Sequence, residues 1–190
     1  MTPNNYTITF NPNTGNCSTS SKSVTYTKTY GELPTPTKTG YNFEGWFSAA
    51  SGGTKITSST ILNTPENQTL YAHWSPVKYT IYFNGNGSSF GSVSSINTEY
   101  DANKVTLSTN NYKKIGYKFI SWNTSSAGNG IQYLNKEQVQ NITTNTSITL
   151  YAQWEFVGDI NYNNLFSLSN WGTSYSGMIN ENDAKMTIDF

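Results

Sequence analysis

The sequence has no arginine, one histidine, one cysteine and few charges of either sign. Its eleven lysines balance eleven acidic residues, and charged residues make up 12% of the chain, about half of the roughly 25% that is usual. Proteins that bind a phosphate backbone need dense clusters of basic side chains. The largest basic cluster here, Lys113, Lys114 and Lys118, is a short patch typical of a solvated surface. We therefore do not expect nucleic acid as a partner.

Long apolar segments are missing as well. Residues 1–10 have neither the basic stretch nor the apolar stretch of a signal peptide, and no later segment approaches the roughly 18 apolar residues of a membrane span. We expect no membrane span, and we expect either that export and anchoring parts lie outside this chain or that the protein reaches its location by assembly with another molecule. The lone Cys17 cannot form a disulfide within the chain, and it lies in a Thr/Ser/Asn-rich loop without a basic partner.

Three short blocks occur twice in the same order. Tyr6–Asn11 returns as Tyr79–Asn84 after 73 positions, Gly40–Trp46 as Gly116–Trp122 after 76, and Leu70–Trp74 as Leu150–Trp154 after 80. Because the offset grows while the order is kept, small insertions lie in the connections and the blocks themselves are intact. The chain is therefore a tandem duplication of one module.

Each block is predicted to be a strand with one apolar face, as the alternation of Leu70, Ala72 and Trp74 with polar neighbours indicates. Asn and Gly residues after the first block, at 11–15 and 84–87, predict tight turns. A further strand is predicted at 24–30, and one or two helical turns at 135–142, where an Asn precedes good helix formers.

The aromatic residues of the blocks are predicted to be structural. Modules of this size have little apolar surface to spare, so rings repeated in phase are needed in the core, although the four tryptophans could also serve as sugar-stacking platforms. These residues are Tyr41, Phe43, Trp46 and Trp74 in the first copy and Tyr117, Phe119, Trp122 and Trp154 in the second.

Domain boundaries follow from the duplication. We expect one module at 1–75, a second at 76–155 and the start of a third, β-rich domain at 156–190, which is either truncated or supplies a strand to another chain. The linker at 75–78 is short and contains a proline, so we expect a limited range of angles between the modules.

No catalytic, metal or cofactor site is expected. His73 aligns with Gln153 in the other copy, and a general base or metal ligand would not be replaced by an amide. The carboxylates are scattered, and calcium at Asn84–Asn86 would want more of them. We expect a protein that is not an enzyme.

The blocks Tyr-x-Ile-x-Phe, Gly-Tyr-x-Phe-x-Gly-Trp and Leu-Tyr-Ala-x-Trp resemble the Listeria-Bacteroides repeat, also called the internalin B repeat, over residues 6–74 and 79–154. The resemblance implies a mainly β, α+β, β-grasp-like fold with mixed sheets and little helix. It also implies repeated arrays on bacterial surface and secreted proteins, which act as stalks or assist adhesion. The second copy departs from the pattern at Ile120 and at Ser121, where the family has Gly.

Three functions follow as hypotheses. The first is a non-catalytic stalk or adhesion segment, extracellular or on a bacterial cell surface, that displays or assists binding to a protein or glycan on a cell. The second is a phage or viral structural protein, such as a fibre, whose partners are neighbouring subunits of the virion. The third is a carbohydrate-binding accessory module that uses Trp171 and Tyr175.

Overall fold

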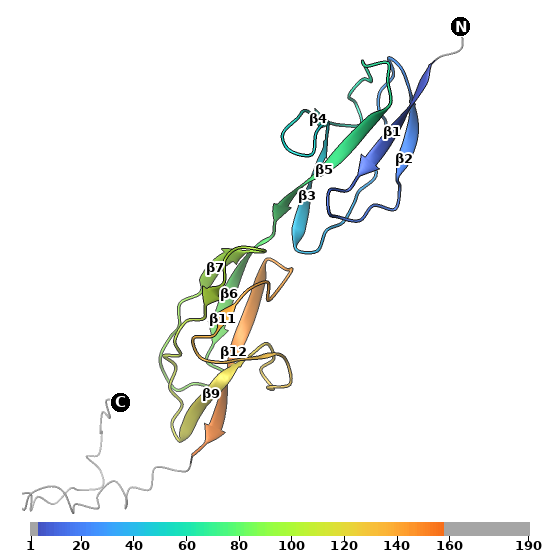
Figure 1. Cartoon of the computed structure of the whole chain (residues 1–190). Coiled ribbons are helices and arrows are strands. Elements are labelled where there is room, and N and C mark those ends of the chain that lie inside the picture. The colour runs from blue at the N-terminus through green and yellow to red at the C-terminus, as the bar shows by residue number, and fades with distance from the viewer. Residues whose placement is uncertain (1–3, 158–190) are drawn as a thin grey trace, which may run out of the picture.

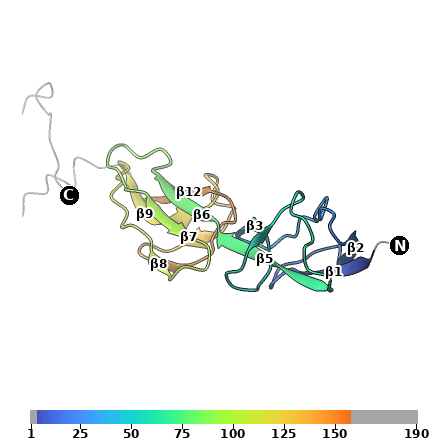
Figure 2. The same cartoon turned by 90° about the horizontal axis from the view of Figure 1, so that it is seen from above.

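The computed structural model describes residues 4–157, which form twelve strands and no helix. They are arranged as two β-sheet modules that follow one another along a single long axis (Figures 1 and 2). The prediction of a mainly β chain with two tandem modules of mixed sheet is therefore confirmed.

The first module is one five-stranded sheet. Its strands are β1 (Asn5–Asn11), β2 (Ser21–Thr25), β3 (Tyr41–Phe47), β4 (Lys55–Ile56) and β5 (Gln68–Pro76), in the order β2-β1-β5-β3-β4. The first and last blocks of the repeat, β1 and β5, run parallel at the centre, and the outer pairings are antiparallel. The parallel pairing of β1 with β5 joins the two ends of the module in one sheet, and each of these two strands then has a neighbouring strand on both sides.

The second module repeats this arrangement. Its sheet consists of β6 (Lys78–Asn84), β7 (Ile96–Glu99), β9 (Tyr117–Asn123), β10 (Gln132–Tyr133) and β12 (Ser147–Phe156), in the order β7-β6-β12-β9-β10. A separate two-stranded ribbon of β8 (Val105–Thr106) and β11 (Gln138–Val139) is added to it.

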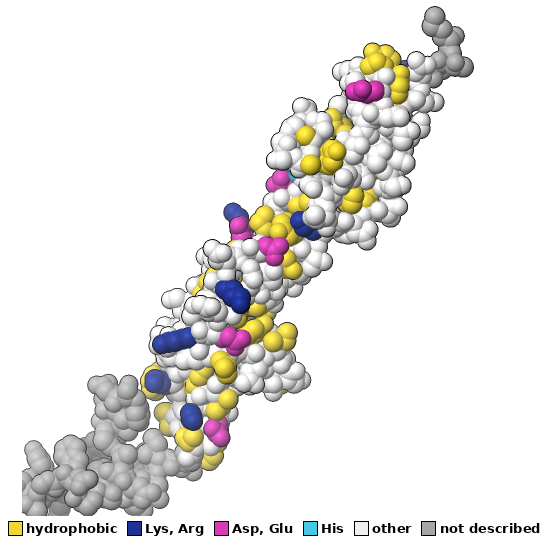
Figure 3. All heavy atoms as spheres, viewed as in Figure 1, with side chains coloured by type: hydrophobic (Ala, Val, Ile, Leu, Met, Phe, Trp, Pro, Cys, Tyr) yellow, Lys and Arg dark blue, Asp and Glu magenta, His cyan; other side chains and the backbone are white. Residues whose placement is uncertain are grey.

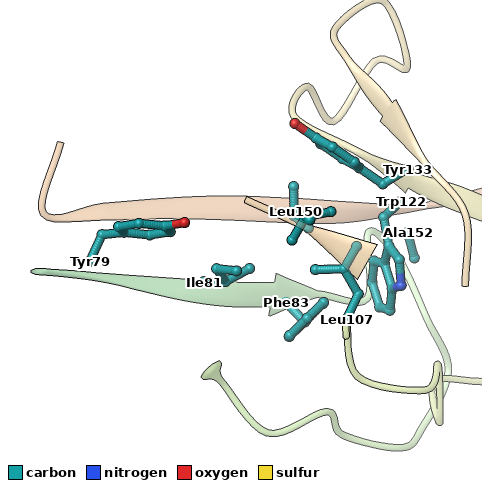
Figure 4. Packing of buried hydrophobic residues seen from close by; sticks show 9 residues of the cluster. Tyr79, Ile81, Phe83, Leu107, Trp122, Tyr133, Leu150 and Ala152 are labelled. Carbon is teal, nitrogen blue, oxygen red and sulfur yellow. The ribbon is translucent and has the colours of Figure 1, made fainter. Parts of the chain in front are cut away.

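Each module has its own core, built from the apolar face that the alternation predicts. In the first, Ile8, Phe10, Leu70 and Ala72 from the central parallel strands pack with Trp46 from β3. In the second, the equivalent side chains belong to the same core as Trp122, as Figure 4 shows. The same figure shows Leu107, from the connection after β8, against the indole ring, so that the core is closed by a loop where many α+β folds use a helix.

The helix expected at 135–142 is wrong. Residues in this stretch form a turn and then β11, which pairs with β8. Lys136 and Asn141 have φ of 61° and 54°, outside the helical region. Val139 is buried in the core, and burial of one apolar side chain on a short strand outweighs the weak helix propensity of eight residues.

The strand expected at 24–30 is shorter than predicted. It ends at Thr25, because Thr27 has a φ of 66° and turns the chain away from the sheet edge. Tyr30 is nevertheless buried, but it reaches the core from the loop after the strand. The mixed sheet agrees with the arrangement implied by the family resemblance, whereas residues 4–157 contain no helix to lie across it.

Candidate functional site: the joint between the modules

A single residue separates the two sheets. β5 ends at Pro76 and β6 begins at Lys78, so that Val77 alone links the modules. Val77 is only 9% exposed. Its N–H donates to the carbonyl of Gly40 in the first module at 2.9 Å, and its carbonyl accepts from the N–H of Tyr100 in the second module at 2.9 Å. The linker is therefore part of both modules.

The ring of Tyr100 packs directly against the backbone of the first module. Gly40 has a φ of 77°, and a Cβ built at this position would overlap the Tyr100 ring. Gly40 thus satisfies two requirements, the left-handed backbone and the close approach of the ring. The neighbouring Tyr41 ring meets Tyr100 edge to face, with centroids 5.9 Å apart.

A carboxylate of the second module completes the joint. The hydroxyl of Tyr41 donates to Oδ2 of Asp101 at 2.7 Å, and the amide of Asn141 donates to Oδ1 at 2.6 Å. In return, Asn141 Oδ1 accepts the backbone N–H of Asp101 at 2.7 Å. The ammonium of Lys38 lies 3.9 Å from the centroid of the Tyr41 ring. Polar and aromatic contacts therefore join the two modules at one place.

These contacts change the acidity of the two partners in opposite directions. The hydrogen bonds from Tyr41 and Asn141 lower the pKa of Asp101, with a smaller contribution from Lys38. The hydrogen bond to Asp101 raises the pKa of Tyr41, and burial and nearby negative charge add to it. A neutral phenol and an ionised carboxylate are thus the favoured states of the pair.

Two open grooves flank the joint. One, of about 730 Å³, has Asn42 and Ser75 on one wall and Thr144–Thr146 on the other. The second, of about 640 Å³, lies between residues 14–16 and Asp101. Ser, Thr and Asn are the commonest residues along both grooves, and Figure 3 shows the visible surface as mostly uncharged, with isolated lysines and acids. Such grooves lack the enclosed apolar wall of a typical small-molecule pocket.

The tryptophans of the repeat blocks have two different positions. Trp46 and Trp122 are fully buried, so neither ring offers a face to a sugar. Trp74 and Trp154, at the end of the third block, are half-buried. Their indole N–H groups donate to carbonyls in the turn after the first block, at 3.0 Å to Pro12 and at 2.9 Å to Gly85.

The asparagines of that turn are also used internally. In the second copy, Asn84 Oδ1 accepts the N–H of Asn86 at 2.8 Å, and the Asn86 amide donates to the carbonyls of Ser126 and Ala152, both at 2.9 Å. Asn13 makes the equivalent contacts in the first copy. Among residues 4–157 there is no cluster of three His, Cys, Asp or Glu side chains that could hold a metal ion.

The remaining aromatic positions of the repeat blocks lie at the core, in the joint and at the far end of the second module. Phe43 and Phe119 lie between the two tryptophans of their modules, with centroids 5.1 to 5.8 Å from each ring. Tyr41 lies in the joint, and Tyr117 is at the far end of the second module. Trp171 and Tyr175, the candidates for carbohydrate binding, lie outside the described residues.

His73 is on the sheet face opposite the core, where its ring stacks on Phe47 with centroids 3.9 Å apart. Its Nε2 is 2.9 Å from the carbonyl of Ala49, and Gln153 makes the same contact with Ser125 at 3.2 Å in the second module. The sequence pattern does not indicate that Tyr100 and Asp101 contact the first module, or that Asn141 holds Asp101 in place. Their only signal is the polar Tyr-Asp pair beyond a strand end, because the alignment of the blocks does not include them.

Comparison with known proteins places the chain in a family. The model of the Listeria-Bacteroides repeat domain matches residues 6–73 and 79–153. Similar proteins include a "Putative membrane protein" of Evansella cellulosilytica, 31% identical over 80% of this chain and 22% of its own length, and a "Putative Gly-rich membrane protein" of the same organism, 34% identical over 73% and 16%. Internalin H of Listeria monocytogenes is 39% identical over 47% of the chain and 17% of its own length.

The chain thus spans less than a quarter of the length of these relatives. Residues 4–157 include no helix of the length and hydropathy that a membrane crossing requires. Both matched segments carry the three blocks in order, and each folds into the same five-stranded sheet. The chain therefore belongs to the Listeria-Bacteroides repeat family, of which it contains two tandem copies.

Proposed function

We propose that the two modules form a stiff, non-catalytic spacer in a bacterial surface protein, where they hold a binding segment away from the cell. The observation that carries this proposal is the joint. One linking residue is bonded to both modules, and Tyr100 and Asp101 of the second module are seated on Gly40 and Tyr41 of the first. Two modules fixed in this way keep their distance and direction, which a flexible linker does not.

Two further observations support the surface location. Hydroxyl and amide side chains are abundant, and the full sequence has a net charge of zero, which suits a segment that remains solvated without attracting charged partners. The relatives are much longer than this chain, and one is an internalin. In this proposal, the protein or glycan on a target cell is bound by segments next to the spacer, which extracellular display places within reach.

Stiffness is tested by rotational diffusion. From NMR relaxation, we expect the two modules of the wild-type chain to tumble as one elongated body. Gly40→Ala forces a side chain into the Tyr100 ring, so the joint opens and the modules tumble separately. Gly52→Ala is the matched control, because Gly52 also has a positive φ, of 66°, but nothing lies within 4 Å of its Cβ position.

Separate tumbling of the modules in the wild-type chain would contradict the spacer. The surface location is tested independently by labelling intact source cells with an antibody raised against residues 4–157. If the antibody labels lysed cells but not intact cells, the surface location is contradicted. Release of product from a panel of glycosides and peptides by the purified chain would contradict the non-catalytic part.

A further inference from the structure

The far end of the second module repeats the surface that forms the joint in the first. In the joint this surface receives a tyrosine and an aspartate, whereas at the far end its side chains are exposed within the described part of the chain. The matched pairs are Lys38 and Lys114, Gly40 and Gly116, Tyr41 and Tyr117, Pro76 and Phe156, and Val77 and Val157. The second member of each pair belongs to what we call the end face: Lys114, Gly116, Tyr117, Phe156 and Val157.

The local geometry of the two surfaces is the same. The valine N–H donates to the glycine carbonyl at 2.9 Å in the joint and at 3.0 Å in the end face. The tyrosine N–H donates to the lysine carbonyl at 3.1 and 3.0 Å. The lysine ammonium lies 3.9 and 4.3 Å from the centroid of the tyrosine ring. The glycines have φ of 77° and 76°. The end face is therefore already in the conformation that accepts a partner in the joint.

The two surfaces differ in how far they are covered. Val77 is 9% exposed in the joint, whereas Val157 is 63% exposed in the end face. Phe156 is 57% exposed and Tyr117 is 38% exposed, and the two rings pack edge to face with centroids 5.2 Å apart. An apolar cluster of two rings and a valine at the end of a module otherwise rich in hydroxyls and amides is typical of a contact surface.

The lysines near the end face indicate that an acidic segment covers this surface. Position 37 is Thr in the joint and its counterpart at 113 is Lys, and Asn42 is replaced by Lys118, so these matched positions near the end face carry three lysines where those of the joint carry one. Glu155, opposite Lys118 in the sheet register, offsets one of these charges. The residues that follow directly, 158–190, carry four carboxylates and a single lysine, together with the rings of Tyr162, Trp171 and Tyr175.

Chain length also permits this. Tyr100, which covers the joint, follows Val77 by 23 positions, and 33 residues follow Val157. We propose that segment 158–190 folds back onto the end face, with an aromatic ring against Gly116 and Tyr117 and a carboxylate beside Lys114. The spacer then continues past the second module with a joint of the same kind. This proposal does not depend on the surface location, and it uses no residue of the first joint.

The test uses the full chain and its Tyr117→Ala variant, with Tyr41→Ala as the matched control at the equivalent position of the joint. Amide hydrogen exchange in residues 158–190 is measured at several protein concentrations. We expect protection in the wild type that Tyr117→Ala lowers by about 2- to 10-fold, as loss of one aromatic pair does, and that Tyr41→Ala leaves unchanged.

Lys114→Ser serves as a second variant in case Tyr117→Ala disturbs the module, whose integrity is read from exchange in β12. It should lower the same protection, and salt should do so in the wild type. Exchange of 158–190 at unprotected rates in the wild type would overturn the proposal, as would equal protection in wild type and Tyr117→Ala. Protection that appears only as concentration rises would assign the end face to a second copy and would overturn it too.

Discussion

The two modules share their strands, register and core, but they satisfy the polar groups of equivalent side chains differently. The indole N–H of Trp46 donates to the carbonyl of Pro34 at 2.8 Å, whereas that of Trp122 has no hydrogen-bond partner among residues 4–157, although both rings are fully buried. The fold thus requires the ring at this position and tolerates an unpaired donor, which costs about 1–3 kcal/mol. The tryptophan of the repeat pattern is therefore required for the shape and size of its ring more than for its hydrogen bond.

The sheet face opposite the core shows a second difference. Where the first module stacks Phe47 on His73, the second has Asn123 at the position of Phe47, and its Oδ1 accepts the N–H groups of Ser125 and Gly130 at 2.9 and 3.0 Å. One module uses two rings to hold the loop after its middle strand, and the other uses an amide. The loop is thus held in both by unlike chemistry, which leaves its outer residues free to vary.

The largest expected effect is on the shared ring. Trp46→Ala and Trp122→Ala should each lower the free energy of unfolding of one module by about 3–5 kcal/mol, because each leaves a cavity in a small core. Calorimetry of the chain should show one transition moving to lower temperature while the other stays. If both modules melt earlier in either variant, the joint couples their stabilities and the two cores are not independent.

A smaller effect separates the two tryptophans. Trp46→Phe leaves the carbonyl of Pro34 without its donor, whereas Trp122→Phe removes an N–H that has no partner. Both variants lose similar apolar area, so we expect Trp46→Phe to cost about 1–3 kcal/mol more. Urea unfolding followed by NMR signals assigned to each module measures both. Equal losses would contradict the comparison.

The duplication, the strands of the blocks and the residues facing each core follow from the sequence, because alternation at period two fixes which side chains are buried. The middle block is the exception to strict alternation. Its strand bulges at Glu44 and at Ile120, which are both exposed, and the bulge persists although Gly45, with a φ of 138°, is replaced by Ser121. The family glycine is therefore not required for the bulge.

The joint could not be predicted in the same way. Tyr41 begins β3, but its partners Tyr100 and Asp101 lie in a turn without periodicity, and nothing in the local pattern of either side indicates the other. The helix prediction at 135–142 was wrong for a related reason, because the conformation of this stretch is decided by the burial of Val139 against distant strands. Sequence patterns indicate the faces of strands well, and they indicate contacts between loops poorly.

The smallest expected effect is the pH dependence of the joint. Among the described residues, the end face has no carboxylate bonded to Tyr117 in the way that Asp101 is bonded to Tyr41. The pKa of Asp101 is lowered from 3.8, so its ionised form favours the joint, and that contribution is lost as pH falls below 3.8 through the lowered pKa. The pKa of Tyr41 is raised from 10.0, so its protonated form favours the joint, and that contribution is lost as pH rises above 10.0. The two modules should therefore tumble as one body at any pH between these limits, and their tumbling should become less coupled outside them.

Asp101→Asn should remove the loss of coupling at acid pH, and Tyr41→Phe should remove the losses at both acid and alkaline pH. A loss of coupling at acid pH that persists in Asp101→Asn would place the titrating group elsewhere.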